Sequence, residues 1–272
     1  MTSVRPVQRP FGDLLRQWRE HRRLSQLELS MQAEVSARHL SFVETGRSSP
    51  SRDMVIRLCE RLDVPLRERN QLLVAAGYAP VYSQTALESQ QMSPVLSAIR
   101  HVLSGHEPFP AAVVDRSWNL VEQNSGFQLF THGVDPELLN SPVNVLRLAL
   151  HPNGLADRIV NIGEWRAHVL SRLRRRIEVT ADPGVTALYE EIRAYPGEWT
   201  EPEIVLPGPG DIVVPLRISD GGRELAFFLA VAAFGTPLDV TMAELTIEVF
   251  FPADDETAAI VRARHETHLA SG

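Results

Sequence analysis

Two short helical segments, separated by only a few residues, constrain the fold of this chain more than any other feature of its sequence. The first follows Ser25 in LSQLELSMQ, where Glu28 stands three residues further on and completes a capping-box pattern. The second follows Ser36 in SARHLSFVETGR and ends at Gly46, because glycine readily adopts the left-handed conformation that closes a helix. With only a tight turn around Glu34 between them, the two segments are predicted to form a helix-turn-helix.

Three more helical patterns surround this pair, and two of them carry clear apolar stripes. These stripes are Phe11, Leu14, Leu15 and Trp18 in the first pattern, and Met54, Leu58 and Leu62 in the second. The second pattern begins after Ser51, and the third runs from about Pro65 to Ala76. We therefore predict an all-α, five-helix helix-turn-helix domain over residues 1–82.

The second helix of the central pair has an unusual outward face. At about 100° per residue, Leu40 and Val43 lie on one side, where they can enter a core. The opposite arc combines small, basic and aromatic residues: Ala37, Arg38, Ser41, Phe42 and Thr45. Such an arc suits neither a core nor an ordinary solvated face with charges of mixed sign. We expect it to contact a partner.

Charge is divided unevenly along the chain. Residues 1–80 hold 13 arginines and 9 acidic residues, a balance of +4, whereas residues 81–272 hold 14 arginines and 25 acidic residues, a balance of −11. A basic domain favours polyanionic partners through counterion release, and an acidic domain disfavours them. The partner of the outward arc is therefore expected to be a nucleic acid.

The motifs LSQLELS, SARHLSFVETGR and SSPS, at this spacing, resemble the Xre-type, or phage-repressor-like, helix-turn-helix family. The resemblance implies binding to double-stranded operator DNA, with the second helix in the major groove. It also implies that Gln26 touches the DNA backbone and braces the reading helix, and that Glu44 pairs with Arg19 for structural reasons. The predicted DNA-binding residues are Gln26, Ser36, Ala37, Arg38, Ser41, Phe42 and Arg47.

Several of these residues have two possible roles. Arg38 can read guanine or bind only phosphate. Phe42 offers no hydrogen bond, so it either contacts a thymine methyl group or a sugar edge, or folds back onto the protein. His39, at the rim, can contact phosphate or pack. Arg47 follows the helix and is expected to clamp the DNA backbone.

A different pattern begins after the stretch AAGYAPVYSQTALESQQMSP. AAVVDRSWNLVEQN predicts two strands around a turn at residues 115–117, and SGFQLF predicts a helix. DIVVPLRIS, RELAFFLAVAAF and ELTIEVFFP predict three more strands with DGG as a hairpin turn, after a long helical block from about Ser141 to Tyr195. We predict an α+β, PAS-like domain over residues 95–260, a five-stranded antiparallel sheet covered by helices. Residues 83–94 are predicted as a connecting segment and residues 261–272 as a tail.

This second region also resembles a known family. HEPFPAAVVDRSWNLVEQN, LHPNGLADRIVNIGEW, YPG and AAFGTPLDVTMAELTIEVFFPADDE are similar to the MmyB-like ligand-binding domain that accompanies Xre-type modules in bacterial regulators. The resemblance covers nearly all of residues 95–257. It implies a one-component transcriptional regulator whose PAS-like pocket can hold a medium-chain fatty acid, with no other cofactor required.

Polar residues inside apolar stretches are the candidates for holding such a ligand. Arg158 and Asn161 stand three residues apart in DRIVNI, so on a helix they would share a face and could jointly hold a carboxylate. The structural alternatives are helix capping and ion pairing with Asp157 or Glu164. The predicted ligand-binding residues are Asn124, His151, Arg158, Asn161 and Trp165.

Large apolar residues leave a second interpretation of this domain open. They can line an acyl cavity or fill a solid core, and they include Phe127, Leu146, Leu150, Ile162, Trp165 and Phe228. With a solid core the domain would serve only for dimerisation or protein interaction, so the presence of a cavity distinguishes the two. A homodimer is expected in either case, because one reading helix covers few base pairs.

Signals for catalysis, metal binding and membrane insertion are weak in this sequence. RHETHL places His265 and His268 one residue short of the zinc-peptidase spacing, and no third ligand is evident. No apolar run approaches membrane-spanning length, and MTSVRPVQRP lacks the apolar core of a signal peptide. Cys59, the single cysteine, falls at an expected buried helix position. We expect a cytoplasmic, nucleoid-associated protein that is not an enzyme and holds no metal.

Overall fold

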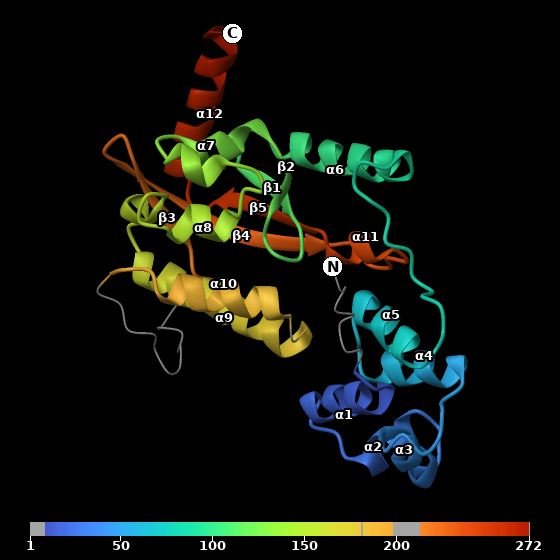
Figure 1. Cartoon of the computed structure of the whole chain (residues 1–272). Helices are drawn as coiled ribbons and strands as arrows, with labels where there is room; N and C mark the ends of the chain where they lie inside the picture. The colour runs from blue at the N-terminus through green and yellow to red at the C-terminus, as the bar shows by residue number, and fades with distance from the viewer. Residues whose placement is uncertain (1–8, 181, 198–212, 272) are drawn as a thin grey trace, which may run out of the picture. The chain divides into compact units, whose positions relative to one another are not determined.

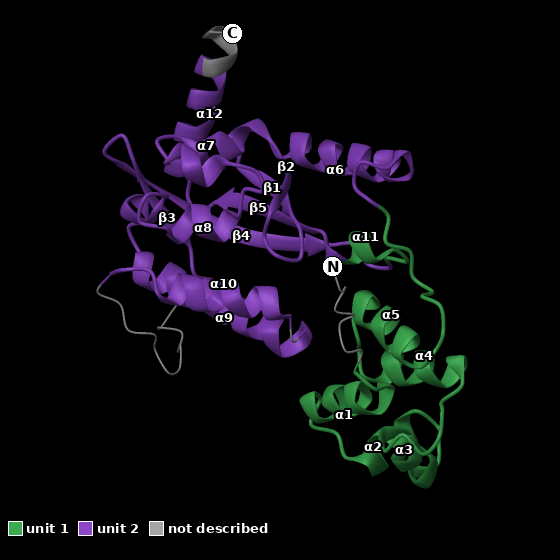
Figure 2. Cartoon of the chain, in the orientation of Figure 1, with its two compact units in different colours: residues 1–85, 237–243 green, residues 86–236, 244–272 purple. Residues whose placement is uncertain are grey.

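The computed structural model describes residues 9–180, 182–197 and 213–271, with side chains up to residue 267. The chain divides into two compact units, which Figure 2 distinguishes by colour. The first unit comprises the residues up to 85 together with 237–243, and the second comprises residues 86–236 and 244–272. Each unit is built around its own apolar core.

Five helices build the N-terminal part of the first unit, as predicted (Figure 1). They are α1 (Phe11–His21), α2 (Gln26–Gln32), α3 (Ala37–Glu44), α4 (Arg52–Arg61) and α5 (Leu66–Ala75). Their apolar faces meet in one core, whose most deeply buried members include Leu15, Leu29, Leu40, Leu58 and Leu72. Burial of one leucine side chain contributes about 1.5–3 kcal/mol. This core therefore fixes the helix-turn-helix pair against the other three helices.

Serine side chains cap the N-termini of three of these helices. The Ser25 hydroxyl accepts a hydrogen bond from the Glu28 amide at 3.1 Å, and the Glu28 carboxylate accepts one from the Ser25 amide at 2.7 Å. The predicted capping box before α2 is thus confirmed. Ser36 accepts from the His39 amide at 3.1 Å at the start of α3, and Ser51 caps α4. Each hydroxyl satisfies an amide that the first helical turn leaves without an intrahelical partner.

Each of these five helices is followed by a residue in the left-handed region. Glycine occupies this place after α3 and α5, where Gly46 has φ +70° and Gly77 has φ +87°. Arg23, Glu34 and Asp63 occupy it after α1, α2 and α4, with φ between +45° and +55°. This conformation costs a non-glycine residue about 1–2 kcal/mol, which the packing of the helices offsets. For this reason glycine marks only two of the five helix ends in the sequence.

Five antiparallel strands form the sheet of the second unit, in the order β2-β1-β5-β4-β3. The strands are β1 (Ala111–Val114), β2 (Leu120–Gln123), β3 (Leu216–Asp220), β4 (Arg223–Ala233) and β5 (Thr246–Pro252). The last strand lies in the centre and joins two hairpins that are far apart in the sequence (Figure 1). The predicted five-stranded antiparallel sheet is confirmed.

Among the described residues, seven helices and four short 3₁₀ turns accompany these elements. The helices are α6 (Ser93–Gly105), α7 (Gln128–Thr131), α8 (Val145–Leu150), α9 (Ile162–Thr180), α10 (Pro183–Arg193), α11 (Val240–Glu244) and α12 (Asp255–Ser271). The 3₁₀ turns are η1 (Gln90–Met92), η2 (Ser125–Phe127), η3 (Pro136–Leu139) and η4 (Ala156–Arg158).

The two faces of the sheet are covered differently. One face, which includes Ala112, Phe227 and Phe250, contributes to the main core together with apolar residues of α8, α9 and α10. On the opposite face Val113 and Ile247 are buried near α6. Register partners Phe228 and Phe251 lie on that same opposite face and remain 39% and 47% exposed. The predicted core or cavity role of Phe228 is therefore wrong, because alternation along β4 turns its ring away from the core.

The helical block predicted from Ser141 to Tyr195 is in fact three helices with an irregular stretch between α8 and α9. A Cβ on Gly154 would lie 2.3 Å from the carbonyl oxygen of Leu148, so the chain folds back here too closely for a larger residue. Beyond that turn, Ile159 forms an isolated bridge with Ile218 of β3. The segment is held by the sheet edge instead of continuing as a helix.

Three further expectations need correction. Residues 261–271 of the predicted tail, residues 261–272, continue α12, in which Val261 is buried and Arg264 pairs with Asp220 of β3. Few large apolar residues mark α12, so the sequence shows no helical stripe there.

Helix α6 was not predicted at all, although it begins within the predicted connecting segment at Ser93. The strand predicted from DIVVPLRIS begins at Leu216, after a proline that has no amide for the ladder, and residues 211 and 212 lie outside the described residues.

Candidate DNA-binding helix and effector site

Helix α3 presents its predicted outward arc on the surface of the first unit. Leu40 and Val43 are buried at 0% and 1% exposure, as the wheel predicted. The predicted DNA-binding residues are all exposed or partly exposed: Gln26, Ser36, Ala37, Arg38, Ser41, Phe42 and Arg47. The fold thus leaves them accessible to a partner, and their contact with DNA remains a prediction.

A buried carboxylate holds α3 against α1. The Glu44 side chain is fully buried, and its two oxygens accept from Arg19, with Nε to Oε1 at 2.7 Å and Nη2 to Oε2 at 3.1 Å. Arg19 also donates to the carbonyl oxygen of Leu24 at 2.8 Å. The hydrogen bond to Glu44 raises the pKa of Arg19 above its ordinary value. The pairing of Arg19 with Glu44 is confirmed as a two-point ion pair.

Further groups converge on Glu44. The Gln26 amide donates from Nε2 to Oε2 of Glu44 at 2.8 Å, which gives a geometry for the bracing role that the family resemblance implied. Arg16 donates to the carbonyl oxygen of Glu44 at 3.4 Å. A Cβ on Gly12 would lie 2.4 Å from that same oxygen, so α1 and α3 approach more closely than any other residue at position 12 would allow. A glycine inside a helical pattern was the only sequence signal for this contact.

Two arginines flank the aromatic ring on α3. The guanidinium carbon of Arg38 lies 5.4 Å from the centre of the Phe42 ring, and that of Arg47 lies 6.0 Å away. These are cation–π distances, at which each pair contributes about 0.5–1 kcal/mol on a surface. Phe42 is partly exposed, so it neither folds into the core nor stands free in solvent. It instead packs between Arg38 on the outward arc and Arg47, which follows α3.

In the second unit, the predicted ligand residue Asn124 has a structural role. It is 7% exposed, and its Oδ1 accepts from the amides of Ala111 at 2.9 Å and Phe127 at 3.2 Å. Its Nδ2 donates to the carbonyl oxygens of Phe109 at 2.8 Å and Leu103 at 3.3 Å. All four hydrogen-bonding positions of the amide are occupied. Asn124 therefore ties α6, β1 and η2 together.

Arg158 does not share a helix face with Asn161, because it ends η4 and Asn161 precedes α9. Its guanidinium donates to the carbonyl oxygens of His132 at 2.8 Å and Leu129 at 3.2 Å. It also pairs with Oδ1 of Asp220 at 3.3 Å. The carboxylate bound to Arg158 in this structure therefore comes from the protein itself.

Asn161 faces a different part of β3. Its Oδ1 accepts from the Arg217 amide at 3.1 Å, and its Nδ2 donates to the Pro215 carbonyl oxygen at 2.8 Å and to Glu164 at 3.0 Å. These bonds fasten the irregular segment before α9 to the edge strand. The expected joint grip of Arg158 and Asn161 on one carboxylate has no support in this geometry.

His151 and Trp165 each contact another aromatic side chain. The His151 ring lies edge-on to Tyr195 at 5.2 Å, and its Nδ1 accepts from the Asn153 amide at 3.1 Å. Trp165 is 4% exposed and stacks on His168 at 5.3 Å. Burial, with smaller effects of neighbouring arginines, lowers the pKa of His168 to about 4, so this stack is uncharged near neutral pH. The side chains of the five predicted ligand residues share no common partner.

A pocket of about 240 Å³ lies beside Arg158 and was not located from the sequence. Leu129 and Val261 form apolar parts of its lining, and His132, Arg264 and Asp220 form polar parts. Leu129, His132 and Asp220 each accept a hydrogen bond from Arg158. Arg158 thus holds three residues of the pocket wall by hydrogen bonds without lining the pocket itself. The lining combines apolar, basic and acidic side chains.

Two regions of the chain match models of known protein families. Residues 95–263 match the family model of the MmyB-like transcription regulator ligand binding domain. The chain belongs to this family of MmyB-like regulators. Residues 10–72 of the regulator match the model of a helix-turn-helix domain, and a comparison with curated proteins found no match. The MmyB-like regulator therefore combines a DNA-binding domain with a ligand-binding domain, and both of the sequence resemblances point the same way.

Within the described ranges of the MmyB-like regulator, no three His, Cys, Asp or Glu side chains are grouped so that they could hold a metal ion. None of the helices in these ranges combines the length and apolar character needed to cross a bilayer. Burial raises the pKa of the Cys59 thiol to about 12, so this cysteine is an unreactive core residue, as expected from its position.

The Glu44 network generates a stability prediction for the regulator. Glu44→Gln should lower the free energy of unfolding of the first unit by about 3 kcal/mol, because it leaves the Arg19 charge without its buried counterion. Glu20→Gln is the matched control, since Glu20 is exposed and lies 3.6 Å from the same arginine, and it should cost about 0.5 kcal/mol or less. Hydrogen exchange at the amides of α3 measures both changes. Equal protection in the two variants would contradict a central role for Glu44.

Proposed function

We propose that this MmyB-like regulator is a one-component transcriptional switch that acts on operator DNA as a homodimer. In this proposal α3 reads the operator, and the C-terminal domain senses an apolar monocarboxylate, such as a medium-chain fatty acid. The observation that carries the DNA part is the accessible arc of α3, held in place by the buried Glu44 network. Because its partner is chromosomal DNA, the regulator would act at the nucleoid in the cytoplasm. Catalysis forms no part of the proposal.

Arg38 is the proposed base-reading residue. A bidentate arginine contact to guanine is worth about 1–3 kcal/mol of discrimination. Arg38→Ala should therefore weaken binding to a selected operator by more than tenfold, while binding to random duplex DNA falls much less. Fluorescence anisotropy with operators obtained by in vitro selection measures both affinities. Equal weakening of both would make Arg38 a phosphate contact.

Arg47→Ala provides the contrast to this variant. Arg47 follows Gly46 at the end of α3 and also flanks the Phe42 ring, but its proposed partner is phosphate. Its loss should weaken specific and random DNA alike and reduce the salt dependence by about one unit of slope. A change confined to the operator would instead assign base reading to Arg47.

The effector proposal is supported by the pocket beside Arg158. Its apolar side chains can cover a hydrocarbon tail, and Arg264 supplies a charge for the carboxylate. Affinity should rise by about 0.8 kcal/mol per methylene until the tail fills the space, and then fall. Calorimetry with saturated monocarboxylates of increasing length tests this course. The absence of binding at every length would remove the effector proposal.

Filling the pocket gives the matching variant. Leu129→Trp should lower affinity for the best acid by about tenfold or more, because the indole takes the volume of the tail. Leu139→Trp is the control, since Leu139 is 37% exposed in η3 and lies outside the pocket lining. An equal effect of both variants would place the acid elsewhere.

The homodimer is supported by the exposed phenylalanines on the sheet. Phe228 and Phe251 are direct partners across β4 and β5, and exposed apolar groups of this kind mark association surfaces. A two-fold dimer would match palindromic half-sites about one helical turn, or a multiple of it, apart. We expect dimers by sedimentation at micromolar concentration and monomers for Phe228→Arg, with Leu139→Arg unchanged. A monomeric parent protein that binds its operator singly would contradict this assembly.

A second candidate function has its own support. The apolar cluster between the sheet and α8, α9 and α10 includes residues for which the sequence allowed either a cavity lining or a solid core, among them Phe127, Leu146, Leu150 and Trp165, each 5% exposed or less. If this cluster is a solid core without a ligand cavity, the domain serves only dimerisation or protein interaction. The calorimetric series separates the two functions, because only the sensor binds acids.

A further inference from the structure

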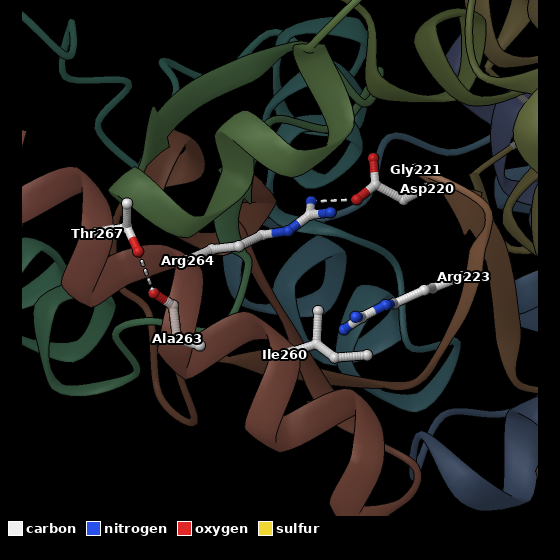
Figure 3. Close-up of a pocket in the computed structure, with 7 residues that line it drawn as sticks. All are labelled: Asp220, Gly221, Arg223, Ile260, Ala263, Arg264 and Thr267. Atoms are coloured by element: carbon white, nitrogen blue, oxygen red, sulfur yellow. Dashed lines mark hydrogen bonds and ion pairs between the residues drawn. The ribbon is translucent and has the colours of Figure 1, made fainter.

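A second pocket lies between the β3–β4 turn and α12, next to the proposed effector site, with which it shares Asp220 and Arg264. It measures about 480 Å³, and its lining includes Asp220, Arg223, Ile260 and Arg264. In Figure 3 the side chains of Arg223 and Arg264 enter this space from opposite walls, one from the strand and one from the helix. Ile260 lies on the helix wall below them. Two cationic groups therefore border one open space.

The turn that carries Arg223 is a tight hairpin. Gly221 has φ +58° and Gly222 has φ +80°, values that only glycine adopts readily, and the predicted DGG hairpin is confirmed. Asp220 and Arg223 close the turn as direct register partners. A Cβ on Gly221 would lie 3.8 Å from Nη2 of Arg264, so the turn passes close to this guanidinium. The hairpin thus fixes the position of the Arg223 backbone, from which its side chain extends.

The arginines around this turn outnumber the carboxylates. Asp220 would be the natural ion-pair partner of Arg223, but its two oxygens bind Arg158 and Arg264 instead. Among the residues that the structure describes, none forms a hydrogen bond or ion pair with the Arg223 side chain. Arg158, Arg223 and Arg264 together exceed the single carboxylate of Asp220 by two positive charges, and the neighbouring Glu224 is already paired with Arg217. This excess occurs in the part of the chain that carries a net charge of −11.

We propose that this pocket binds a small anion, a carboxylate or a phosphate group, between Arg223 and Arg264. The planar guanidinium presents paired N–H donors that match the oxygens of either group. Arg264 uses Nη1 for Asp220, and its side chain is 47% exposed, so it can contact an anion while it keeps α12 attached to β3. The anion neutralises the excess charge that Asp220 alone leaves.

This site goes beyond the effector proposal and can be tested separately. Arg264 and Asp220 border both pockets, whereas Arg223 borders only the larger one and Leu129 only the smaller one. Arg223→Gln should leave binding of the longer monocarboxylates unchanged. Leu129→Trp should leave binding of small anions unchanged. Failure of either site therefore does not decide the other.

The test is a titration of the full-length protein, labelled with ¹⁵N, with sodium phosphate and with sodium acetate at constant ionic strength. The Nε–Hε signals of the arginines report binding. We expect saturable shifts for Arg223 and Arg264 with at least one of the two anions. Saturation by phosphate alone identifies a phosphoryl ligand. Saturation by acetate alone identifies a carboxylate ligand, and saturation by both anions shows that the site accepts either group.

Variants decide whether Arg223 is responsible. Arg223→Gln should raise the dissociation constant of the anion by about tenfold or more. Because Arg223 is exposed at the start of β4, the substitution should not impair folding. Arg262→Gln is the matched control on α12, because Arg262 is exposed, lies over Phe109 and is not part of the pocket lining. Linear shifts without saturation, or an unchanged dissociation constant in Arg223→Gln, would overturn the proposal.

Discussion

The buried ion pair between Arg19 and Glu44 is the interaction on which the arrangement of the first unit depends. A carboxylate removed from water is stable only when its oxygens are fully hydrogen-bonded. Arg19 and Gln26 supply those bonds from α1 and from the first turn of α2. One side chain at the end of α3 thereby fixes the relation of three helices. This internal contact therefore also sets the orientation of the outward arc of α3.

A comparable constraint organises the second unit, where β5 lies in the middle of the sheet. The sheet can close only when the last strand inserts between the hairpin of β1 and β2 and the hairpin of β3 and β4. The segments that connect these strands supply the helices of the main core. Side groups that looked like ligand contacts, above all Asn124 and Asn161, instead hold these connections to the strands. Their amides supply hydrogen bonds to buried backbone groups that the strands and helices leave unpaired.

Asp220 links the structural and chemical features of this unit. Its carboxylate binds Arg158 from the irregular segment and Arg264 from α12, so three distant parts of the chain meet at the end of β3. Both described pockets border this residue. An arginine that an internal acid already binds differs from one that awaits a ligand. The proposed anion site therefore depends above all on Arg223, because Arg158 and Arg264 both already pair with Asp220.

The sequence by itself determined the five helices of the first unit, the strands and the hairpin turn at residues 220–223, because capping serines, periodic apolar residues and paired glycines act over a few neighbouring positions. It also located the buried side of α3, and the family resemblance supplied the partner of Glu44. Only the tertiary structure decided that Arg158 pairs with Asp220, that Phe228 faces away from the core and that α12 returns to the sheet. Those outcomes depend on groups tens of residues apart, whose meeting is set by packing and by the hydrogen-bonding needs of buried polar atoms.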